Sequence, residues 1–442
     1  MDYKSDILII GGGAAGLMAA YAAASAGEAS VIVLEKMPRP GRKIMITGKG
    51  RCNFSNVKSW NDFSAHVRAG KDFLRPAFFN LPPEKLIQLF NDNGLETVVE
   101  RGDRAFPASY KSMDVVDTLV GMAKGAGAKI MTEKEVIIIN ADDEEFTVIC
   151  KDADVFSCSK LIIATGGLSY PTTGSTGDGY KWATSFGHEL KQCFPSLTAL
   201  VPEGYKIIDE VPSDRHIDRS LPLSEYGSSL CGVSLKNVGV MVFNGKDAIQ
   251  SEVGDVDFTD GGLEGPIGFQ VSRNSVKSLI NGARLAVVMD LKPAVEYSSL
   301  VARVENLWKE ISDDYRSRRL DAKGRLVVLL GKLLPREVID GFVSGNQDLM
   351  RNGRVDLVAV VKALKGWRIP ISGYVGYERC VITAGGVDVK EVSKKTMESR
   401  LEEGLYFCGE VLDVDADTGG YNLQIAFCTG YLAGLSAAKN IV

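Results

Sequence analysis

The chain has 442 residues, of which 45% are hydrophobic and 24% charged, and its formal net charge at pH 7 is −5. A length beyond the roughly 250–300 residues at which a single core stops growing predicts two or three domains. The nearly balanced charge is typical of a soluble globular protein without a polyelectrolyte partner, so we expect no nucleic-acid partner.

The first predicted elements are a strand, a glycine-rich turn, a helix and a second strand. The apolar run 7–10 is followed by Gly11-Gly12-Gly13-Ala14-Ala15-Gly16, and the apolar run 31–34 ends at the acidic residue Glu35. This order is typical of a βαβ unit that binds a dinucleotide.

Each residue of the turn has a physical role in that interpretation. Gly11 permits the tight turn, Gly13 lets a pyrophosphate approach the backbone, and Gly16 lets the helix close onto the sheet. The start of the helix offers free N–H groups and the positive end of its dipole to the phosphates. Glu35 lies 35 − 16 = 19 positions after the last glycine, near the roughly 20-residue offset of a carboxylate that binds ribose hydroxyls. Because this carboxylate repels a 2′-phosphate, the unit favours FAD or NAD over NADP.

The stretch from residue 7 to residue 27 carries no charge and has nearly the length of a membrane span. Glycines and alanines interrupt it, and the acidic residues Asp2 and Asp6 precede it, so we predict a buried strand and helix and no membrane association. Without an export signal, the expected location is the cytoplasm.

A basic, glycine-rich loop follows the second strand and runs to Asn56. Its glycines let the backbone approach a ligand closely, while Arg42, Lys43 and Arg51 supply positive charge. We expect this loop to contact a pyrophosphate or a reduced flavin anion.

Helices and strands then alternate up to residue 196. Apolar spacing predicts helices over 83–90 and 115–127, and alternation predicts strands over 129–140 and 145–151. A buried strand over 160–165 runs into Gly166 and Gly167 and should return to the first sheet.

The character of the sequence changes after Pro195. Short β-rich runs such as 238–243 alternate with turns, and helical patterns then dominate, as over 297–311 and 324–334. Glycine-punctuated strands and a final amphipathic helix return from residue 369. We therefore predict a discontinuous first domain, residues 1–196 and 369–442, an inserted β-rich domain, residues 197–292, and an inserted helical domain, residues 293–368.

Five segments resemble a known family. They are GRKxxxTGxGRCNxSN at residues 41–56, GGxSYPxTGSTGDG at 166–179, FTDGGLEGP at 258–266, and the glycine-rich stretches at 404–410 and 419–424. They are similar to the motifs of the BaiN/RdsA-like family of NAD(P)/FAD-dependent oxidoreductases, whose relatives include aminoacetone oxidase-like enzymes. In the third segment Asp260 and Glu264 stand where that family usually has His and Ser.

The resemblance implies FAD as the cofactor and an α/β fold, with a discontinuous Rossmann-like FAD-binding domain and an inserted β-barrel-like and helical unit. The residues agree, because a second glycine-rich turn at Gly419 can present backbone N–H groups to the flavin pyrimidine ring as its charge grows. We expect Glu410 and Asp413 at the ribityl chain. The full set of expected cofactor-binding residues is Gly11, Gly13, Ala14, Ala15, Gly16, Glu35, Lys36, Gly41, Arg42, Lys43, Thr47, Gly48, Arg51, Cys52, Asn53, Val136, Thr165, Gly166, Gly167, Gly409, Glu410, Asp413, Gly420, Asn422, Leu423 and Gln424.

Four residues are candidates for a direct part in catalysis: Cys52, Tyr170, Asp260 and Tyr421. Cys52 lies in the basic loop, where a thiolate would be stabilised, although most cysteines are small packing groups. Eight scattered cysteines without a CxxC pair favour reduced thiols, and with only three histidines we expect no metal site.

Neither the cysteine pair of a disulfide reductase nor a second dinucleotide fold for NAD(P)H is found. The leading hypothesis is therefore an FAD-dependent oxidoreductase that exchanges hydride between the flavin and a small organic substrate, with NAD(P)H as one candidate donor. Reduction of an enone and oxidation of an amine by O₂ both remain open, as does the oligomeric state. The alternative is a flavin- or nucleotide-binding regulatory protein without turnover.

Overall fold

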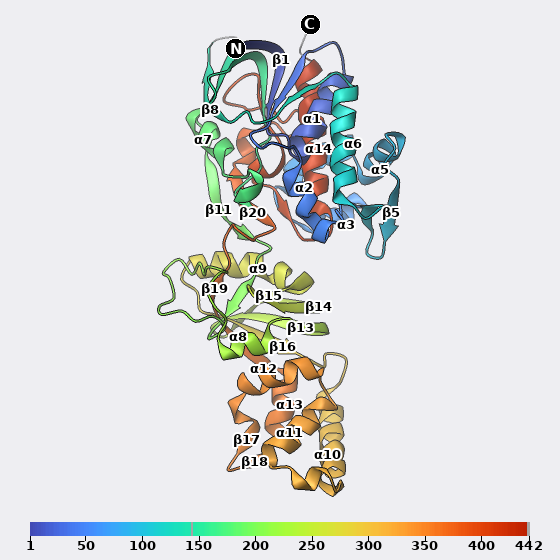
Figure 1. The fold of residues 1–442 in the computed structure, drawn as a ribbon, viewed down its shortest axis with the longest axis vertical. Coiled ribbons are helices and arrows are strands. Elements are labelled where there is room, and N and C mark those ends of the chain that lie inside the picture. Colours follow the sequence, from blue (N-terminus) through green and yellow to red (C-terminus); the bar gives the residue numbers. More distant parts are fainter. Residues whose placement is uncertain (143–144, 440–442) are drawn as a thin grey trace. The chain divides into compact units, whose positions relative to one another are not determined.

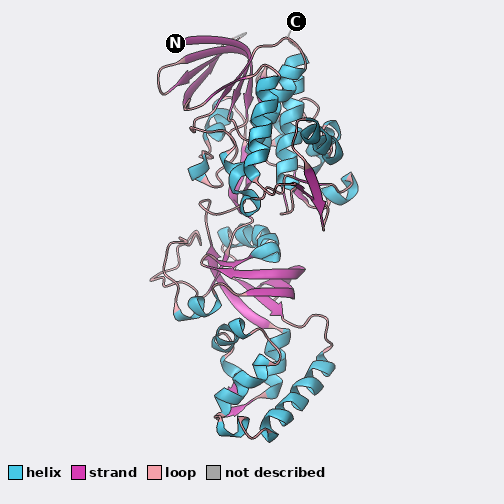
Figure 2. Ribbon diagram, turned by 45° about the vertical axis from the view of Figure 1, so that its right-hand side comes forward, coloured by secondary structure: helices cyan, strands magenta, loops and turns pink. Residues whose placement is uncertain are grey.

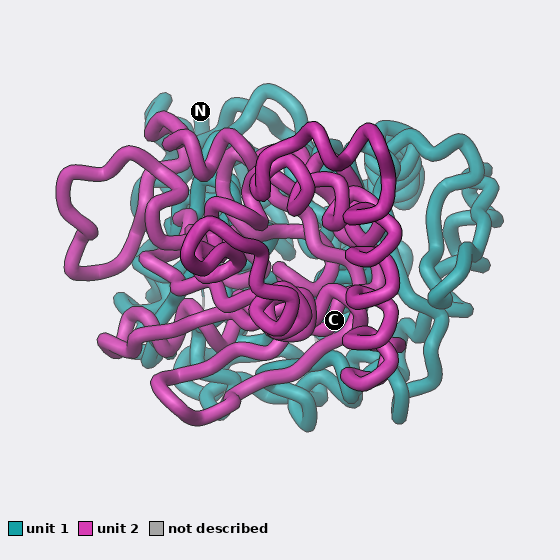
Figure 3. Tube along the Cα trace, turned by 90° about the horizontal axis from the view of Figure 1, so that it is seen from below, with its two compact units in different colours: residues 1–195, 377–442 teal, residues 196–376 magenta. Residues whose placement is uncertain are grey.

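The computed structural model describes residues 1–142 and 145–439 and divides into two compact units (Figures 1 and 3). Unit 1 comprises residues 1–195 and 377–442, and unit 2 comprises residues 196–376. Unit 1 is thus discontinuous in the sequence. It resumes at residue 377 rather than at the predicted residue 369, because β19 (Trp367–Tyr374) pairs with strands of unit 2.

Unit 1 is built on a seven-stranded mixed sheet with the order β7-β2-β1-β10-β9-β8, to which β21 adds beside β10. The parallel strands are β1 (Asp2–Ile10), β2 (Val31–Leu34), β7 (Lys129–Met131), β10 (Val155–Ile163) and β21 (Leu405–Phe407). The antiparallel strands are β8 (Val136–Ala141) and β9 (Phe146–Cys150). Because Ile7–Ile10 and Leu161–Ile163 are buried on both faces, these segments are continuous apolar runs.

Two helices pack closely beside this sheet, α1 (Ala14–Ser25) and the C-terminal α14 (Tyr421–Lys439) (Figures 1 and 2). A side chain at Gly430 would lie 2.2 Å from the carbonyl oxygen of Ala15, and one at Gly434 would lie 2.2 Å from that of Ala19. The two backbones therefore approach each other only because both positions are glycine. This contact joins the two ends of the chain.

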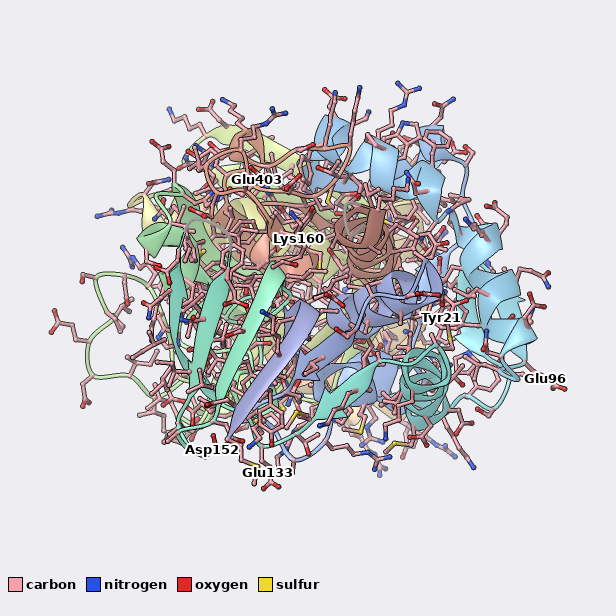
Figure 4. The ribbon with its side chains drawn as sticks, turned by 90° about the horizontal axis from the view of Figure 1, so that it is seen from above. Tyr21, Glu96, Glu133, Asp152, Lys160 and Glu403 are labelled. Carbon is pink, nitrogen blue, oxygen red and sulfur yellow. The ribbon has the colours of Figure 1, made fainter. Side chains whose placement is uncertain are left out.

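The other helices of unit 1 are α2 (Arg42–Ile46), α3 (Trp60–Ser64), α4 (Lys71–Asn80), α5 (Pro83–Asp92), α6 (Ser112–Gly125) and α7 (Asp178–Ser185). Its short strands are β3 (Ser55–Asn56), β4 (Val67–Ala69), β5 (Thr97–Glu100), β6 (Arg104–Pro107), β11 (Leu190–Ser196), β20 (Ile382–Val387) and β22 (Asp415–Ala416). Figure 4 labels four exposed acidic side chains of this unit, Glu96, Glu133, Asp152 and Glu403.

Unit 2 contains a closed barrel with the strand order β12-β15-β14-β13-β16-β19. Its first five strands are β12 (Leu200–Pro202), β13 (Ser234–Asn244), β14 (Asp247–Thr259), β15 (Gly262–Glu264) and β16 (Leu285–Asp290). The barrel also carries α8 (Glu225–Leu230) and α9 (Gly265–Ile280). The sixth strand, β19, closes the barrel by pairing with β12 and β16.

A helical part lies between β16 and β19 in the sequence. It contains α10 (Tyr297–Asp313), α11 (Ala322–Gly331), α12 (Ile339–Ser344), α13 (Leu357–Lys365) and a hairpin of β17 (Met350–Arg351) and β18 (Arg354–Val355). The predicted α/β fold with an inserted barrel and helices is confirmed. No helix within the described residues combines the length and apolar character needed to cross a membrane.

Candidate functional site

A cleft opens in unit 1 at the carboxyl ends of β1, β2 and β10, where Ile10, Leu34 and Ala164 line it. This is the edge at which open α/β sheets bind their ligands. The cleft is partly open to solvent, and its lining extends from Gly11 before α1 to Leu423 at the start of α14.

Most of the expected cofactor-binding residues meet in this cleft. The residues that line it are Gly11, Gly13, Ala14, Ala15, Glu35, Lys36, Gly41, Arg42, Lys43, Thr47, Val136, Thr165, Gly166, Gly409, Glu410, Asn422 and Leu423. The remaining nine do not line it: Gly16, Gly48, Arg51, Cys52, Asn53, Gly167, Asp413, Gly420 and Gln424.

The glycine-rich turn has two different steric demands. A side chain at Gly16 would lie 1.8 Å from the carbonyl oxygen of Gly11, and one at Gly11 would lie 2.5 Å from that of Ala164. Both glycines therefore permit close packing of α1 against the sheet. A side chain at Gly13 would meet no protein atom within 4 Å. The backbone at Gly13 is thus open to the cleft, at the start of a helix whose first N–H groups have no intrahelical acceptor.

Glu35 directly follows β2, and its carboxylate is held by backbone donors. Oε2 accepts a hydrogen bond from Gly12 N and Oε1 accepts one from Met37 N, each at 2.8 Å. Burial raises the pKa of this carboxyl above its usual value, and the two N–H groups oppose that shift. Since a carboxylate has about four acceptor sites, Glu35 keeps capacity for hydroxyl donors from a ligand.

A second carboxylate, Glu410, ties four segments together beside the cleft. Lys43 Nζ donates to Glu410 Oε2 at 2.5 Å and to Ser169 Oγ at 3.0 Å. Ser169 Oγ and Thr383 N both donate to Glu410 Oε1, at 2.5 and 2.8 Å. The network joins α2, which carries Lys43, to three other segments. These are the loop after β10 with Ser169, strand β20 with Thr383, and the turn after β21 with Glu410.

Another ion pair closes the cleft near the end of β2. Lys36 Nζ donates to Asp178 Oδ2 at 2.6 Å and to Thr176 Oγ1 at 2.5 Å. Burial acts to raise the pKa of Asp178, but the hydrogen bonds from Lys36 and Thr176 outweigh it and hold that pKa below its usual value. Trp182, on the helix that Asp178 begins, also lines the cleft.

The N-terminus of α14 reaches the cleft from the far end of the chain. Asn422 and Leu423 line it, and the first intrahelical bond of this turn runs from Gln424 N to Gly420 O. Gly420 has a positive φ of 96°, and a side chain there would lie 2.3 Å from Ser55 O and 2.8 Å from Asn53 Oδ1. The sequence needs glycine at this turn because the backbone of the basic loop lies against it.

The four catalytic candidates do not line the cleft. Cys52 is fully buried, and burial raises the pKa of its thiol to about 12. Tyr421 is buried, its ring stacks on His66 at 4.5 Å, and burial raises the pKa of its hydroxyl. Asp260, in unit 2, forms a two-pronged ion pair with Arg219. Tyr170 is held at a φ of 52°, a conformation that L-residues seldom adopt.

Several lining residues were missing from the predicted set. Asp178, Trp182, Lys134 and Thr383 come from segments far from the first βαβ unit. Asp178 lies in the motif at residues 166–179, so this motif could have identified it as a cofactor-binding residue. Thr383 carries no local signal, since pairing and packing of β20 place it.

Comparison with known proteins shows which family the chain belongs to. The family model described as "HI0933-like protein Rossmann domain" matches residues 5–436. The chain is 31% identical over 432 residues to a 3-dehydro-bile acid delta(4,6)-reductase of Clostridium scindens, covering 98% of each chain. It is 30% identical over 439 residues to a ribosomal RNA dihydrouridine synthase of Escherichia coli, covering 99% of each.

Solved structures show the fold alone. A 3-ketosteroid-delta4-(5alpha)-dehydrogenase from Rhodococcus jostii has a TM-score of 0.51 at 14% identity, covering 99% of this chain and 97% of that chain. The fold and the relatives define the class, a Rossmann-type family of flavoprotein oxidoreductases. Within that class, the chain belongs to the HI0933-like family.

Proposed function

We propose that the chain binds FAD and exchanges hydride between the flavin and a small organic substrate. The observation that carries this proposal is the convergence of three groups in one cleft: the open N-terminus of α1 at Gly13, the Glu35 carboxyl, and the N-terminus of α14 at Asn422. When bound, FAD supplies the two-electron chemistry that protein side chains lack.

The residues present fit this cofactor. Gly13 leaves bare backbone for a pyrophosphate, and Glu35 keeps acceptor sites for ribose hydroxyls.

The residues of the chain bind, orient and shield the reacting groups. The α1 and α14 N-termini place positive helix dipoles where phosphate charge and reduced-flavin charge are expected. Lys43 adds a full positive charge, which Glu410 and Ser169 hold at a fixed position. Ile44, Val381, Ile382 and Leu423 line the cleft with apolar surface, which limits the entry of water.

For the direction of the reaction we propose reduction of a carbon–carbon double bond conjugated to a carbonyl group, with NAD(P)H as the electron donor. The direction rests on the names of the two relatives, a delta(4,6)-reductase of a 3-dehydro-bile acid and a ribosomal RNA dihydrouridine synthase, and the donor is the one that the family resemblance implies. Both names describe saturation of such a bond in a ring. The substrate of this chain would be a ring of the same chemistry, a steroid-like enone or a uracil.

Anaerobic reduction tests the proposal. The purified protein should be yellow, and its visible flavin absorbance should bleach with NADH or NADPH. Adding a steroid enone or a uridine-containing RNA should restore the colour faster than adding oxygen. Faster reoxidation by oxygen alone, with bleaching by an amine, would identify an oxidase instead.

The alternative is a flavin-binding regulatory protein without turnover. It predicts a yellow protein that neither nicotinamide nucleotides nor a panel of enones and amines reduces or reoxidises. A colourless protein that cannot be reconstituted with FAD would contradict both functions.

A further inference from the structure

The helical part of unit 2 concentrates positive charge in one short segment. Residues 316–336 contain seven Lys and Arg and one acidic residue, a net charge of 7 − 1 = +6, whereas the whole chain carries −5. The small net charge of the whole chain led us to expect no polyelectrolyte partner. That sum does not show that positive charge is concentrated in this one segment. Strong local asymmetry of this kind indicates a partner with opposite charge.

Six exposed cations of this region belong to neighbouring elements. We call them the basic patch: Arg316, Arg318, Arg319, Lys323, Arg351 and Arg354. The first four lie on the short 3-10 turn η3 (Ser317–Arg319), directly before it, or in the first turn of α11, and the last two lie on the β17–β18 hairpin. Because α11 packs against both η3 and β18, the elements that carry the basic patch are neighbours within the helical part.

The hairpin places two positive charges opposite each other. Arg351 and Arg354 are direct cross-strand partners, and the turn between them, Asn352-Gly353, has positive φ angles of 50° and 73°. An Asn-Gly turn fixes the register of a hairpin, and like charges directly opposite each other destabilise it. The two arginines, Asn352 and Asp356 line a solvent-open cleft, and the Asp356 carboxylate accepts from Ala359 N. A bound anion would relieve the repulsion that the chain itself builds here.

Three nearby acidic residues accept hydrogen bonds from backbone N–H groups. Asp314 accepts from Ser317 N at 2.8 Å, Asp321 from Gly324 N at 2.7 Å, and Asp356 from Ala359 N at 3.0 Å. These three carboxylates cap a turn and two helix N-termini. Arg318 approaches Asp313 at 3.8 Å, but both side chains are largely exposed, and such pairs contribute little. The patch therefore stays available to an external anion.

An exposed aromatic ring completes the surface. Tyr315 is 68% exposed, and the guanidinium carbon of Arg319 lies 4.7 Å from its ring centroid. Bases of single-stranded nucleic acid stack on such rings while nearby cations contact the phosphates. Tyrosine rings also occupy membrane interfaces, so anionic vesicles are the competing partner that the binding test must separate from RNA.

We propose that the basic patch binds the phosphate backbone of single-stranded nucleic acid, with Tyr315 stacking on a base. This inference is independent of the flavin chemistry, since binding requires no electron transfer.

Fluorescence anisotropy with the full-length, FAD-loaded protein and a labelled single-stranded RNA of about 16 nucleotides tests the patch. Affinity should fall as salt rises, since each phosphate contact adds about 0.7 to the slope of log K against log salt. Arg351→Glu/Arg354→Glu should weaken binding about tenfold or more and reduce the slope by about 1.4. The matched control Lys394→Glu/Lys395→Glu makes the same charge change on exposed residues of unit 1 and should change affinity less than about twofold.

Two single substitutions separate binding from folding. Arg354→Glu creates an opposite-charge pair with Arg351, so the melting temperature should stay equal or rise while RNA affinity falls. Tyr315→Ala should weaken RNA binding about fivefold or more, whereas Tyr297→Ala, at another exposed tyrosine of the helical part, should not.

Three results would overturn the inference: RNA affinity that the Arg351/Arg354 variant leaves unchanged, equal loss in the Lys394/Lys395 control, or binding to phosphatidylglycerol vesicles without binding to RNA. Normal RNA binding by a protein that never bleaches would contradict only the proposed reduction. Bleaching and turnover without RNA binding would contradict only the patch.

Discussion

At Glu35 the chain buries a carboxyl group at the end of β2. The site exists because Gly12 N and Met37 N donate to the two oxygens, so that an otherwise costly buried carboxylate is held in one orientation. Glu35 also lines the cleft. Hydrogen bonds to charged groups contribute about 1.5–3 kcal/mol, so a ligand hydroxyl bound here would gain substantially.

Glu35→Arg should therefore weaken FAD retention at least roughly tenfold, corresponding to about 1.4 kcal/mol. The change removes the ribose acceptor and leaves an unpaired cation. The ratio of flavin to protein absorbance after gel filtration measures this. Glu96→Arg, at an exposed position of unit 1, should keep normal flavin content. Equal flavin content in both variants would show that Glu35 does not bind the cofactor.

Burial of Cys52 lowers the reactivity of its thiol. A thiol whose pKa is about 12 is about one part in ten thousand thiolate at pH 8, and the thiolate is the reactive form. In the native protein Cys52 should therefore resist iodoacetamide at pH 8, and only pH values approaching 12 should ionise it. Mass spectrometry of the labelled peptide measures this. Cys52→Ser should keep flavin content and reduction by NAD(P)H, and loss of reduction with normal flavin content would restore a redox role.

At the scale of elements, the first turn of α1 separates a folding requirement from a binding requirement. A methyl group at Gly16 would lie 1.8 Å from Gly11 O, which forces α1 away from the sheet, whereas one at Gly13 enters open space. Gly16→Ala should lower the free energy of unfolding by about 2 kcal/mol or more, seen as a lower melting temperature.

Gly13→Ala should instead fold with nearly unchanged stability and lose FAD, because the methyl group occupies the space expected for the pyrophosphate. Flavin content and melting temperature together distinguish the two variants. If Gly13→Ala retained flavin as wild type does, the pyrophosphate would have to bind elsewhere.

The sequence predicts those parts of the site that lie close to one another along the chain. Gly11 to Gly16, Glu35 and Lys43 follow from one βαβ unit and its adjoining loop, where spacing carries the information. Thr383 is placed by β20, a strand with no motif of its own. The four catalytic candidates do not line the cleft, because burial and ion pairing are tertiary properties that a local motif does not contain.

At the scale of the whole molecule, the same distinction explains the domain boundaries. The inserted β-rich and helical segments were predicted from local patterns, and the structure combines them in one compact unit. The predicted return to the first domain at residue 369 fell inside β19, which closes the barrel with β12 and β16. Barrel closure pairs strands more than 150 residues apart in the chain, and no local pattern encodes that pairing.

The cofactor cleft is drawn entirely from unit 1, and so is the hydrophobic core that supports it. A unit with its own core can fold by itself, so replacing residues 196–376 with a flexible glycine-serine linker should yield a folded, yellow protein. Circular dichroism and flavin absorbance measure the two properties separately. The shortened protein should lose RNA affinity, because the basic patch lies within the deleted residues. A folded but colourless product would show that unit 2 is required for FAD retention, and would move part of the cofactor site out of unit 1.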